Sequence, residues 1–327
     1  MQPKIVYVLI SSDNDIYLEQ AYISMFSVKY HMPDSHITLL TDKTTEFSFT
    51  NNRRKEIVYA NEIISIDIDA KKYNAQQRSR ILKTSARQYI KGDFIFIDSD
   101  TIVVKPFPDT HDFTSPILAC WDTHAAFKEN PYRDMCLKHG HLLQWPIDQE
   151  ETYFNSGVLY VKEDIISYEF YKKWNENLLK GFEVGVYMDQ PSFAKTNFQM
   201  GHIVERLDDL WNCELKHGVK YMRDAYIWHY LCTNKSNNHN KQLFILNENS
   251  VMIDVKETAI ISDNIKQVVI DPFSGLANVT HCFAGEDVYY FQNPLQKKLR
   301  ELYNTNKFSY LEKLLKAYHK FRLLIRL

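Results

Sequence analysis

The stretch Phe94-Ile95-Phe96-Ile97-Asp98-Ser99-Asp100 is the most informative part of this chain of 327 residues. Its first four residues are all apolar, which is typical of a strand buried on both faces of a sheet. The two aspartates that follow are spaced i and i+2, so their side chains leave the same face of an extended backbone. Two oxygen ligands at the carboxyl end of a buried strand form half of a divalent-cation site, and open α/β sheets hold ligands at that end. A solvated turn is the alternative interpretation of the same residues.

The composition is that of an ordinary globular protein large enough for one big domain with an appendage, or for two domains. Hydrophobic residues make up 45% and charged residues 24%, and the formal net charge of −2 gives no reason to expect a nucleic-acid partner. Only nine glycines occur, and no glycine-rich phosphate-binding motif is present. If the protein binds phosphates, a cation and side chains must hold them.

Cysteine usage and the amino terminus favour an intracellular, cytoplasmic protein. The five cysteines are widely spaced without a CxxC pair, which indicates buried thiols in a reducing compartment rather than a zinc site or a disulfide framework. The apolar run Ile5–Ile10 is too short for a signal sequence, and no stretch approaches the length of a membrane span.

The first half of the chain alternates predicted strands and helices, which favours a mostly parallel sheet with helices on both faces. The predicted strands are Ile5–Ile10, His36–Thr41, Ile57–Ala60, Phe94–Ile97, Ile117–Trp121, Gly157–Val161 and Ile227–Tyr230. The predicted helices are Leu18–Tyr30, Gln76–Lys91 and one that begins at Pro191, and residues 51–55 are expected to form a polar connection. Beyond residue 240 the segment 241–255 is polar with some β character. We therefore expect a catalytic domain over residues 1–240 and a C-terminal extension over 241–327.

Three further segments carry polar side chains that suit a ligand site. On the helix Gln76–Lys91, Arg80, Lys83 and Arg87 share one face, which is either a solvated basic face or a set of cations for a phosphate or sugar. Asn155 and Ser156 precede a strand, and Asp189 and Gln190 precede a helix; an ordinary turn and an ordinary helix start are the alternatives.

A single histidine interrupts the apolar strand Ile227–Tyr230, with Lys235 six residues after it. A lone histidine is more often structural than a ligand. Imidazole is nonetheless a common third ligand where carboxylates supply the first two, so His229 is a candidate metal ligand.

Taken in order, these motifs resemble the family-8 retaining glycosyltransferases, which include glycogenin and bacterial lipopolysaccharide galactosyltransferases. The resemblance covers roughly residues 4–236 and consists of Asp-x-Asp after a strand, then Asn-Ser-Gly-Val, then Asp-Gln, then His-x₅-Lys. It implies a GT-A fold, with a Rossmann-like mostly parallel sheet flanked by helices; the pattern of the last residues adds a C-terminal helical appendage. It also implies a UDP-sugar donor and a Mn²⁺ ion, or Mg²⁺ in its place, that bridges the diphosphate.

The resemblance assigns expected roles to individual residues. Asp98, Asp100 and His229 are the implied metal ligands, and Lys235 is the implied lysine on the diphosphate. The implied donor-binding residues are Ser11, Ser12, Tyr17, Arg80, Lys83, Asp98, Ser99, Asn155, Asp189, Gln190, His229 and Lys235, with Ser11, Ser12 and Tyr17 at the uracil. Asp189, Gln190 and Lys235 are the implied catalytic residues.

The sequence departs from the family pattern after His229. The family usually has His-x-x-Gly-x-x-Lys followed by Pro-Trp, whereas here Cys232 replaces the glycine and Ser236-Asn237 replace Pro-Trp. The backbone can therefore approach the phosphate differently at this point.

The expected activity is metal-assisted transfer of a hexose, with glucose or galactose favoured, to a glycan or lipid-linked acceptor. Retention of configuration favours attack from the leaving-group face, because Gln190 is a feeble nucleophile; Asp189 as the nucleophile stays open. The alternatives are a metal-dependent phosphohydrolase and a non-catalytic sugar-nucleotide-binding protein.

The last residues are strongly basic. Residues 297–327 hold nine Lys or Arg and two Glu, a local charge of +7. Apolar residues recur there at helical spacing, which predicts an amphipathic helix that either lies peripherally on an anionic membrane, at its inner face, or packs on the catalytic domain. Apolar crowding at the free end favours the membrane.

Overall fold

The computed structural model describes residues 3–231, residues 244–276 and several helical positions between 294 and 318. The chain divides into two compact units, Met1–Ala277 and Asn278–Leu327. All of the site residues discussed below belong to the first unit. Within the described residues, no helix is long and apolar enough to cross a lipid bilayer.

The first unit is built on a sheet of seven strands in the order β3-β2-β1-β4-β7-β6-β8. β1 pairs in parallel with β2 on one side and with β4 on the other, and only the pairs that include β7 are antiparallel. The expected mostly parallel α/β sheet is thereby confirmed. The strands span Lys4–Leu9 (β1), Ile37–Asp42 (β2), Glu62–Ile66 (β3), Phe94–Ile97 (β4), Ile117–Trp121 (β6), Phe154–Val161 (β7) and Val204–Arg206 (β8).

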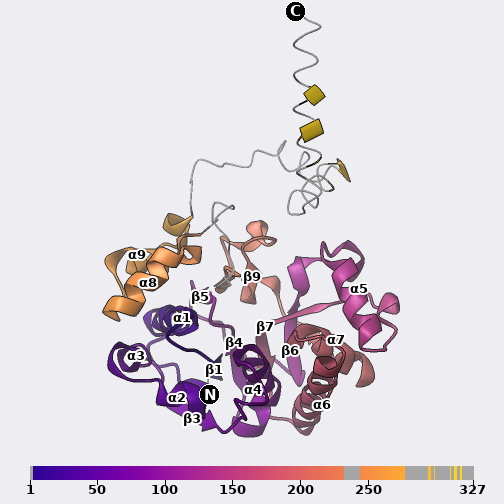
Figure 1. Cartoon of the computed structure of the whole chain (residues 1–327), viewed down its shortest axis with the longest axis horizontal. Helices are drawn as coiled ribbons and strands as arrows, with labels where there is room; N and C mark the ends of the chain where they lie inside the picture. The colour runs from indigo at the N-terminus through magenta and orange to yellow at the C-terminus, as the bar shows by residue number, and fades with distance from the viewer. Residues whose placement is uncertain are drawn as a thin grey trace, which may run out of the picture. The chain divides into compact units, whose positions relative to one another are not determined.

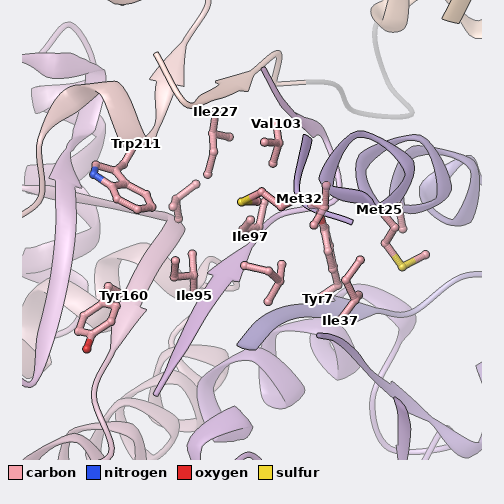
Figure 2. Packing of buried hydrophobic residues seen from close by; sticks show 14 of the residues in the cluster. Tyr7, Met25, Met32, Ile37, Ile95, Ile97, Val103, Tyr160, Trp211 and Ile227 are labelled. Atoms are coloured by element: carbon pink, nitrogen blue, oxygen red, sulfur yellow. The ribbon is translucent and has the colours of Figure 1, made fainter. Parts of the chain in front are cut away.

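Helices cover both faces of this sheet (Figure 1). On one face, α4 (Ala75–Tyr89), α6 (Ile165–Glu183) and α7 (Asp189–Gln199) bury Leu82, Phe170 and Phe193 against the strands. On the other face, α1 (Tyr17–His31) packs with Met25 against Tyr7 of β1. Figure 2 shows this second core, in which Ile95 and Ile97 of β4 lie among side chains from α1 and from the segments that follow β4.

A small second sheet places the candidate histidine beside the aspartate pair. It has the order β5-β10-β9, with strands Thr101–Val103 (β5), Ile227–His229 (β10) and Cys213–Glu214 (β9). β5 follows the aspartates directly and pairs antiparallel with β10, so that His229 lies opposite Thr101. This pairing brings together the aspartates and His229, which are more than a hundred residues apart in the sequence.

Two helices after the predicted boundary belong to the first unit. α8 (Asn249–Thr258) and α9 (Asp263–Ile270) pack Val255, Ile265 and Val268 into a core that includes Tyr22 and Ile23 of α1. The first compact unit accordingly extends to residue 277 and passes the boundary expected near 240. The β character expected for 241–255 is wrong from residue 249 onward, because Met252 and Val255 bury one face of a helix; Phe244 alone forms an isolated bridge, with Leu276.

Two predictions for the segment after β2 are also wrong. Residues 51–55 form a short helix, α3 (Asn51–Lys55), which follows α2 (Lys43–Phe47). Residues 57–60 are a turn, and the third strand is instead β3, which continues the parallel pairing with β2. Tyr59 of this turn packs on α1, where its ring stacks on Tyr22 at 5.5 Å between centroids, whereas Val58 is exposed; packing replaces strand pairing here.

Several remaining elements differ from expectation only in their limits. α7 begins at Asp189, two residues before Pro191, and β7 begins at Phe154, so Asn155 and Ser156 lie inside a strand. α5 (Arg133–Leu142) packs beside α7 and lies outside the segments that the sequence pattern identified.

Candidate functional site

The strand order reverses between β1 and β4, and the site lies at that point. β2 and β3 continue the sheet on one side of β1, whereas β7 and β6 continue it beyond β4. Open α/β sheets bind ligands outside the carboxyl ends of the strands at such a switch point. The turn Ser11–Asp15 follows the carboxyl end of β1, and Asp98–Asp100 follow that of β4.

Asp98, Asp100 and His229 converge on one small volume. One ligand atom from each lies within 4.8 Å of the other two. His229 Nε2 is 3.2 Å from Asp100 Oδ1, and Tyr230 N donates to the Asp100 carbonyl over 3.1 Å. Residues 98–100 form a bend rather than the extended backbone that the spacing argument assumed, so the convergence arises from the bend and from the pairing of β5 with β10.

A chain of buried amides fixes the orientation of the His229 ring. His229 Nδ1 lies 3.0 Å from Asn212 Oδ1, and Asn212 Nδ2 donates to Asn155 Oδ1 over 3.0 Å. Asn155 Nδ2 in turn donates to Asp122, whose carboxylate can only accept. The donors and acceptors of these hydrogen bonds can therefore be arranged in one way only: Nδ1 of His229 is protonated and donates a hydrogen bond to Asn212. The other ring nitrogen, Nε2, faces the aspartates. This arrangement is typical of metal-binding histidines, whose other ring nitrogen is held by a polar partner.

The absence of a side chain at Gly157 provides the space in which His229, Asn155 and Asp98 come together. A Cβ atom at this position would lie 2.6 Å from His229 Cε1, 2.9 Å from Asn155 Oδ1 and 3.0 Å from Asp98 Oδ2. Gly157 O also accepts from Asp98 N at 2.8 Å, which ties the end of β4 to β7. The glycine of the Asn-Ser-Gly-Val motif is thus required by contact rather than by backbone conformation.

The charges of the three candidate ligands influence each other. Burial raises the pKa of Asp98, although Lys83 opposes that shift. Burial alone would lower the pKa of His229, but the neighbouring carboxylate of Asp100 raises it above its ordinary value. Two carboxylates and one imidazole around a small volume are a donor set that suits a divalent cation, so these residues fit a metal.

Two cations of α4 link the aspartate pair to Asp189. Lys83 Nζ lies 3.2 Å from Asp98 Oδ1 and 3.0 Å from Asp189 Oδ2. Arg80 Nε lies 3.1 Å from Asp189 Oδ1, and Ser156 Oγ donates to Asp189 Oδ2 over 2.9 Å. Burial alone would raise the pKa of Asp189, but the two cations hold it well below its ordinary value. The alternative of a solvated basic face is wrong for Lys83, whose side chain is 3% exposed.

Arg87 lies in a different environment from Arg80 and Lys83. It donates to the carbonyls of Ile90 and Gly92 and lies over the rings of Phe94 and Tyr168. It therefore caps the end of α4 and takes no part in the cluster around Asp98 and Asp189.

The structure brings together most, but not all, of the residues expected at the site. Ser11 and Ser12 lie in the turn after β1, and Tyr17 follows at the start of α1, within electrostatic reach of Arg80. Ser99 and Gln190 are partly exposed, and each follows directly in the sequence after an aspartate that forms an ion pair, Asp98 and Asp189 respectively. Lys235, Cys232 and Ser236-Asn237 lie outside the described residues.

Two residues of the network escaped the sequence interpretation. Asn212 contacts His229 directly, and Asp122 is linked to it through Asn155. Ser156, which the sequence indicated together with Asn155, donates to Asp189. No pattern around Asn212 could have indicated its partner, since their contact depends on the pairing of β9 with β10.

The sequence was compared with known families and structures. The family description for nucleotide-diphospho-sugar transferases matches residues 78–256, more than half of the chain and the part that holds Arg80, the aspartate pair, Asp189 and His229. The chain belongs to this family. The resemblance drawn from the motifs is thereby confirmed at the level of a nucleotide-sugar glycosyltransferase.

One solved structure supports the fold of this nucleotide-diphospho-sugar transferase, and a second is similar to it. The galactosyltransferase LgtC in complex with donor and acceptor sugar analogues is 14% identical, with a TM-score of 0.50 over 81% of this chain and 99% of that one. Mouse xyloside xylosyltransferase 1 in its apo form is 16% identical, with a TM-score of 0.47 over 71% of this chain and 98% of that one. The first likeness shows that the fold is of the GT-A type. A comparison with curated protein sequences gave no match.

Proposed function

We propose that this transferase is a retaining hexosyltransferase of the family-8 type that uses a UDP-hexose donor and Mn²⁺, or Mg²⁺ in its place. The observation that carries the proposal is the convergence of Asp98, Asp100 and His229 within 4.8 Å at the switch point of the sheet. The ring orientation of His229 and the clearance at Gly157 support the assignment of these three residues as the metal ligands.

The chemistry requires stabilisation of a departing nucleoside diphosphate. When bound, the divalent ion would supply positive charge to the diphosphate oxygens. Lys235 is proposed to add a second positive charge, as expected from the sequence. Arg80 is proposed to contact the donor; its partial exposure and the electrostatic effect of Tyr17 on it support this proposal.

The surroundings of Asp189 support attack from the leaving-group face. Its carboxylate is buried and ion-paired with both Arg80 and Lys83, and it accepts a further hydrogen bond from Ser156. A carboxylate neutralised in this way is a weak nucleophile, so we assign Asp189 the role of holding the two cations. Gln190 is next in the chain and is proposed to contact the sugar, together with Asn155 and Ser99. A phosphate oxygen of the donor would then accept the proton of the acceptor hydroxyl.

Glucose and galactose are the favoured sugars, and a glycan or a lipid-linked sugar is the favoured acceptor. We further propose that the basic C-terminal helix lies on anionic membranes. The described positions Tyr310, Leu314 and Tyr318 are helical, and their side chains are exposed. Co-sedimentation with anionic vesicles tests this: the full chain should bind and dissociate in high salt, and a chain truncated after residue 305 should not bind. Equal behaviour of the two proteins would contradict it.

The decisive experiment measures release of UDP from a panel of UDP-sugars with Mn²⁺, with Mg²⁺ and after EDTA. The proposal expects UDP release only in the presence of metal, with transfer once the right acceptor is added. Binding of nucleotide without release would indicate a non-catalytic binding protein, and cleavage of simple phosphoesters would indicate a phosphohydrolase. Use of a GDP- or dTDP-sugar alone would contradict the proposed uracil contact of Ser11, Ser12 and Tyr17.

A further inference from the structure

The turn after β1 is held together by one carboxylate. Ser11 Oγ donates to Asp15 Oδ1 over 2.7 Å, and Ser12 N and Oγ both donate to Asp15 Oδ2, over 2.7 and 2.9 Å. Tyr17 N donates to the same side chain over 3.2 Å. All three residues proposed to hold the nucleotide base are therefore positioned through Asp15, so the shape of this turn decides where the base can bind.

Two cations from other helices hold the backbone and the first hydroxyl of this turn. Lys256 of α8 donates through Nζ to the carbonyls of Asp13, over 3.0 Å, and of Asp15. Arg53 of α3 donates to Ser11 Oγ over 3.2 Å, and its Nε lies 3.5 Å from Asp13 Oδ1. A lysine ammonium has three protons in a compact group, which suits two carbonyls and a carboxylate at once.

The third partner of Lys256 is a buried carboxylate. Lys256 Nζ lies 3.5 Å from Glu19 Oε1, and Glu19 is fully buried on α1. Glu56, directly after α3, is equally buried, and burial together with the charge of Glu19 raises its pKa to about 8. Burial raises the pKa of Glu19 as well, and the cations Lys256 and Arg53 oppose that shift. The ammonium group of Lys256 is thus held both by the carboxylate of Glu19 and by the carbonyls of the turn.

The helix that carries Lys256 is itself attached on two sides. Asn52 Nδ2 of α3 donates to the Glu257 carbonyl over 2.7 Å, and Tyr22 Oη of α1 donates to the Ala259 carbonyl over 3.3 Å at the end of α8. Lys256 therefore joins the turn to a helix that α1 and α3 hold in place.

We infer that Lys256 is a positioning residue that fixes the turn Ser11–Asp15 in the shape that accepts the nucleotide base. The inference rests on the proposed function for the identity of the ligand, but the contact between Lys256 and the turn does not depend on it. Without the ammonium group, the carbonyls of Asp13 and Asp15 lose their donor, and the turn samples other conformations. A ligand that must order a loop binds more weakly, so the expected effect is a roughly threefold to tenfold higher Kd for UDP.

The test compares Lys256→Met with Lys266→Met in the full chain. Methionine keeps most of the apolar length of lysine and removes the charge. Lys266 is an exposed lysine of α9 whose ion pair is with Asp263, one turn earlier in the same helix, at 2.9 Å, so it is a matched control. Hydrogen exchange of the peptide covering residues 11–17 and UDP affinity by calorimetry are measured for both variants.

Lys256→Met should accelerate exchange in residues 11–17 without altering exchange in β4 and β7, and should raise the Kd for UDP and the KM for the donor. It should leave kcat at saturating donor within about twofold, because Lys256 does not touch the reacting atoms. Lys266→Met should change none of these quantities. Lys256→Arg keeps the charge and should restore most of the protection of the turn.

Wild-type exchange of residues 11–17 in Lys256→Met would overturn the inference. So would faster exchange throughout the unit in both Lys256 variants, which would show a general structural role. If the wild-type protein does not bind UDP, the proposed function fails, and the exchange measurement alone still decides whether Lys256 fixes the turn.

Discussion

Replacement of Gly157 by alanine tests the metal site through a single methyl group. The added Cβ would lie 2.6 Å from His229 Cε1, whereas ordinary contacts begin at 3.4 Å, so the ring must retreat by about 0.8 Å. Retreat is opposed on both sides, because Nδ1 is held by Asn212 at 3.0 Å and Nε2 lies 3.2 Å from Asp100. Asp98 Oδ2, at 3.0 Å from the added atom, would be displaced as well.

Overpacking of this kind costs about 1–3 kcal/mol when it is relieved by small shifts. Because two of three ligands move, we expect Mn²⁺ affinity to fall about tenfold to a hundredfold, the range found when the surroundings of metal ligands are disturbed. Calorimetric titration with Mn²⁺ measures the affinity, and circular dichroism with thermal unfolding measures the integrity of the fold.

Gly201→Ala is the matched control. Gly201 has a positive φ of 77° with no atom within 4 Å of an added Cβ, so alanine there is strained without touching the site. It should lower stability by about 1–2 kcal/mol and leave Mn²⁺ affinity unchanged. A Gly157→Ala protein that is folded and binds Mn²⁺ as tightly as wild type would refute the assignment of His229 and Asp98 as ligands of one ion.

Three further predictions concern single side chains. Asp98→Ala and Asp100→Ala should each abolish metal-dependent UDP release, by on the order of a hundredfold or more, with the fold intact; near wild-type release in both would contradict the site. Lys235→Ala should lower kcat more than it weakens donor binding, because its charge matters most as the diphosphate departs, and steady-state kinetics with a UDP-binding titration separate the two effects. Glu56→Gln should change the pH dependence of stability. The folded pKa of Glu56 is raised to about 8 from 4.5, so its contribution is complete below the lower value and is lost as pH rises towards and through the higher one. Urea unfolding between about pH 5 and about pH 8 should therefore show a smaller loss of stability in the variant than in wild type, and equal slopes would contradict the raised pKa.

The parts of the fold that could be predicted are those whose sequence signal is local. The continuous apolar run of β4 identified a strand at its true limits, and the apolar period of α4 identified a helix with errors of two residues or fewer at its ends. The expected strand at 57–60 was wrong because four apolar residues suit a turn packed on α1 equally well. α8 escaped notice because its buried face depends on contact with α1, which lies more than two hundred residues earlier.

The candidate site shows the same division. Asp98, Asp100 and the Asn155–Gly157 motif could be found because each stands beside a strong strand signal. From the sequence, His229 could be either a metal ligand or a structural residue. Its proximity to the aspartates depends on the three-residue pairing of β5 with β10, which the sequence does not reveal. Asn212 could not be proposed, because an asparagine before a two-residue strand has no distinctive pattern.

The amide chain from Asp122 to His229 restricts how this protein can change. Each of its asparagines donates to one neighbour and accepts from the other, so an isosteric Asn212→Asp change would set a carboxylate oxygen against Asn155 Oδ1. With the new carboxyl group ionised, the hydrogen bond to Asn155 could re-form only by reversing the Asn155 amide, which would turn its oxygen towards the carboxylate of Asp122. A substitution at Asn212 alone therefore disturbs the hydrogen bonds of both Asn155 and Asp122. Related sequences that retain the histidine should either keep all three residues or replace all three together.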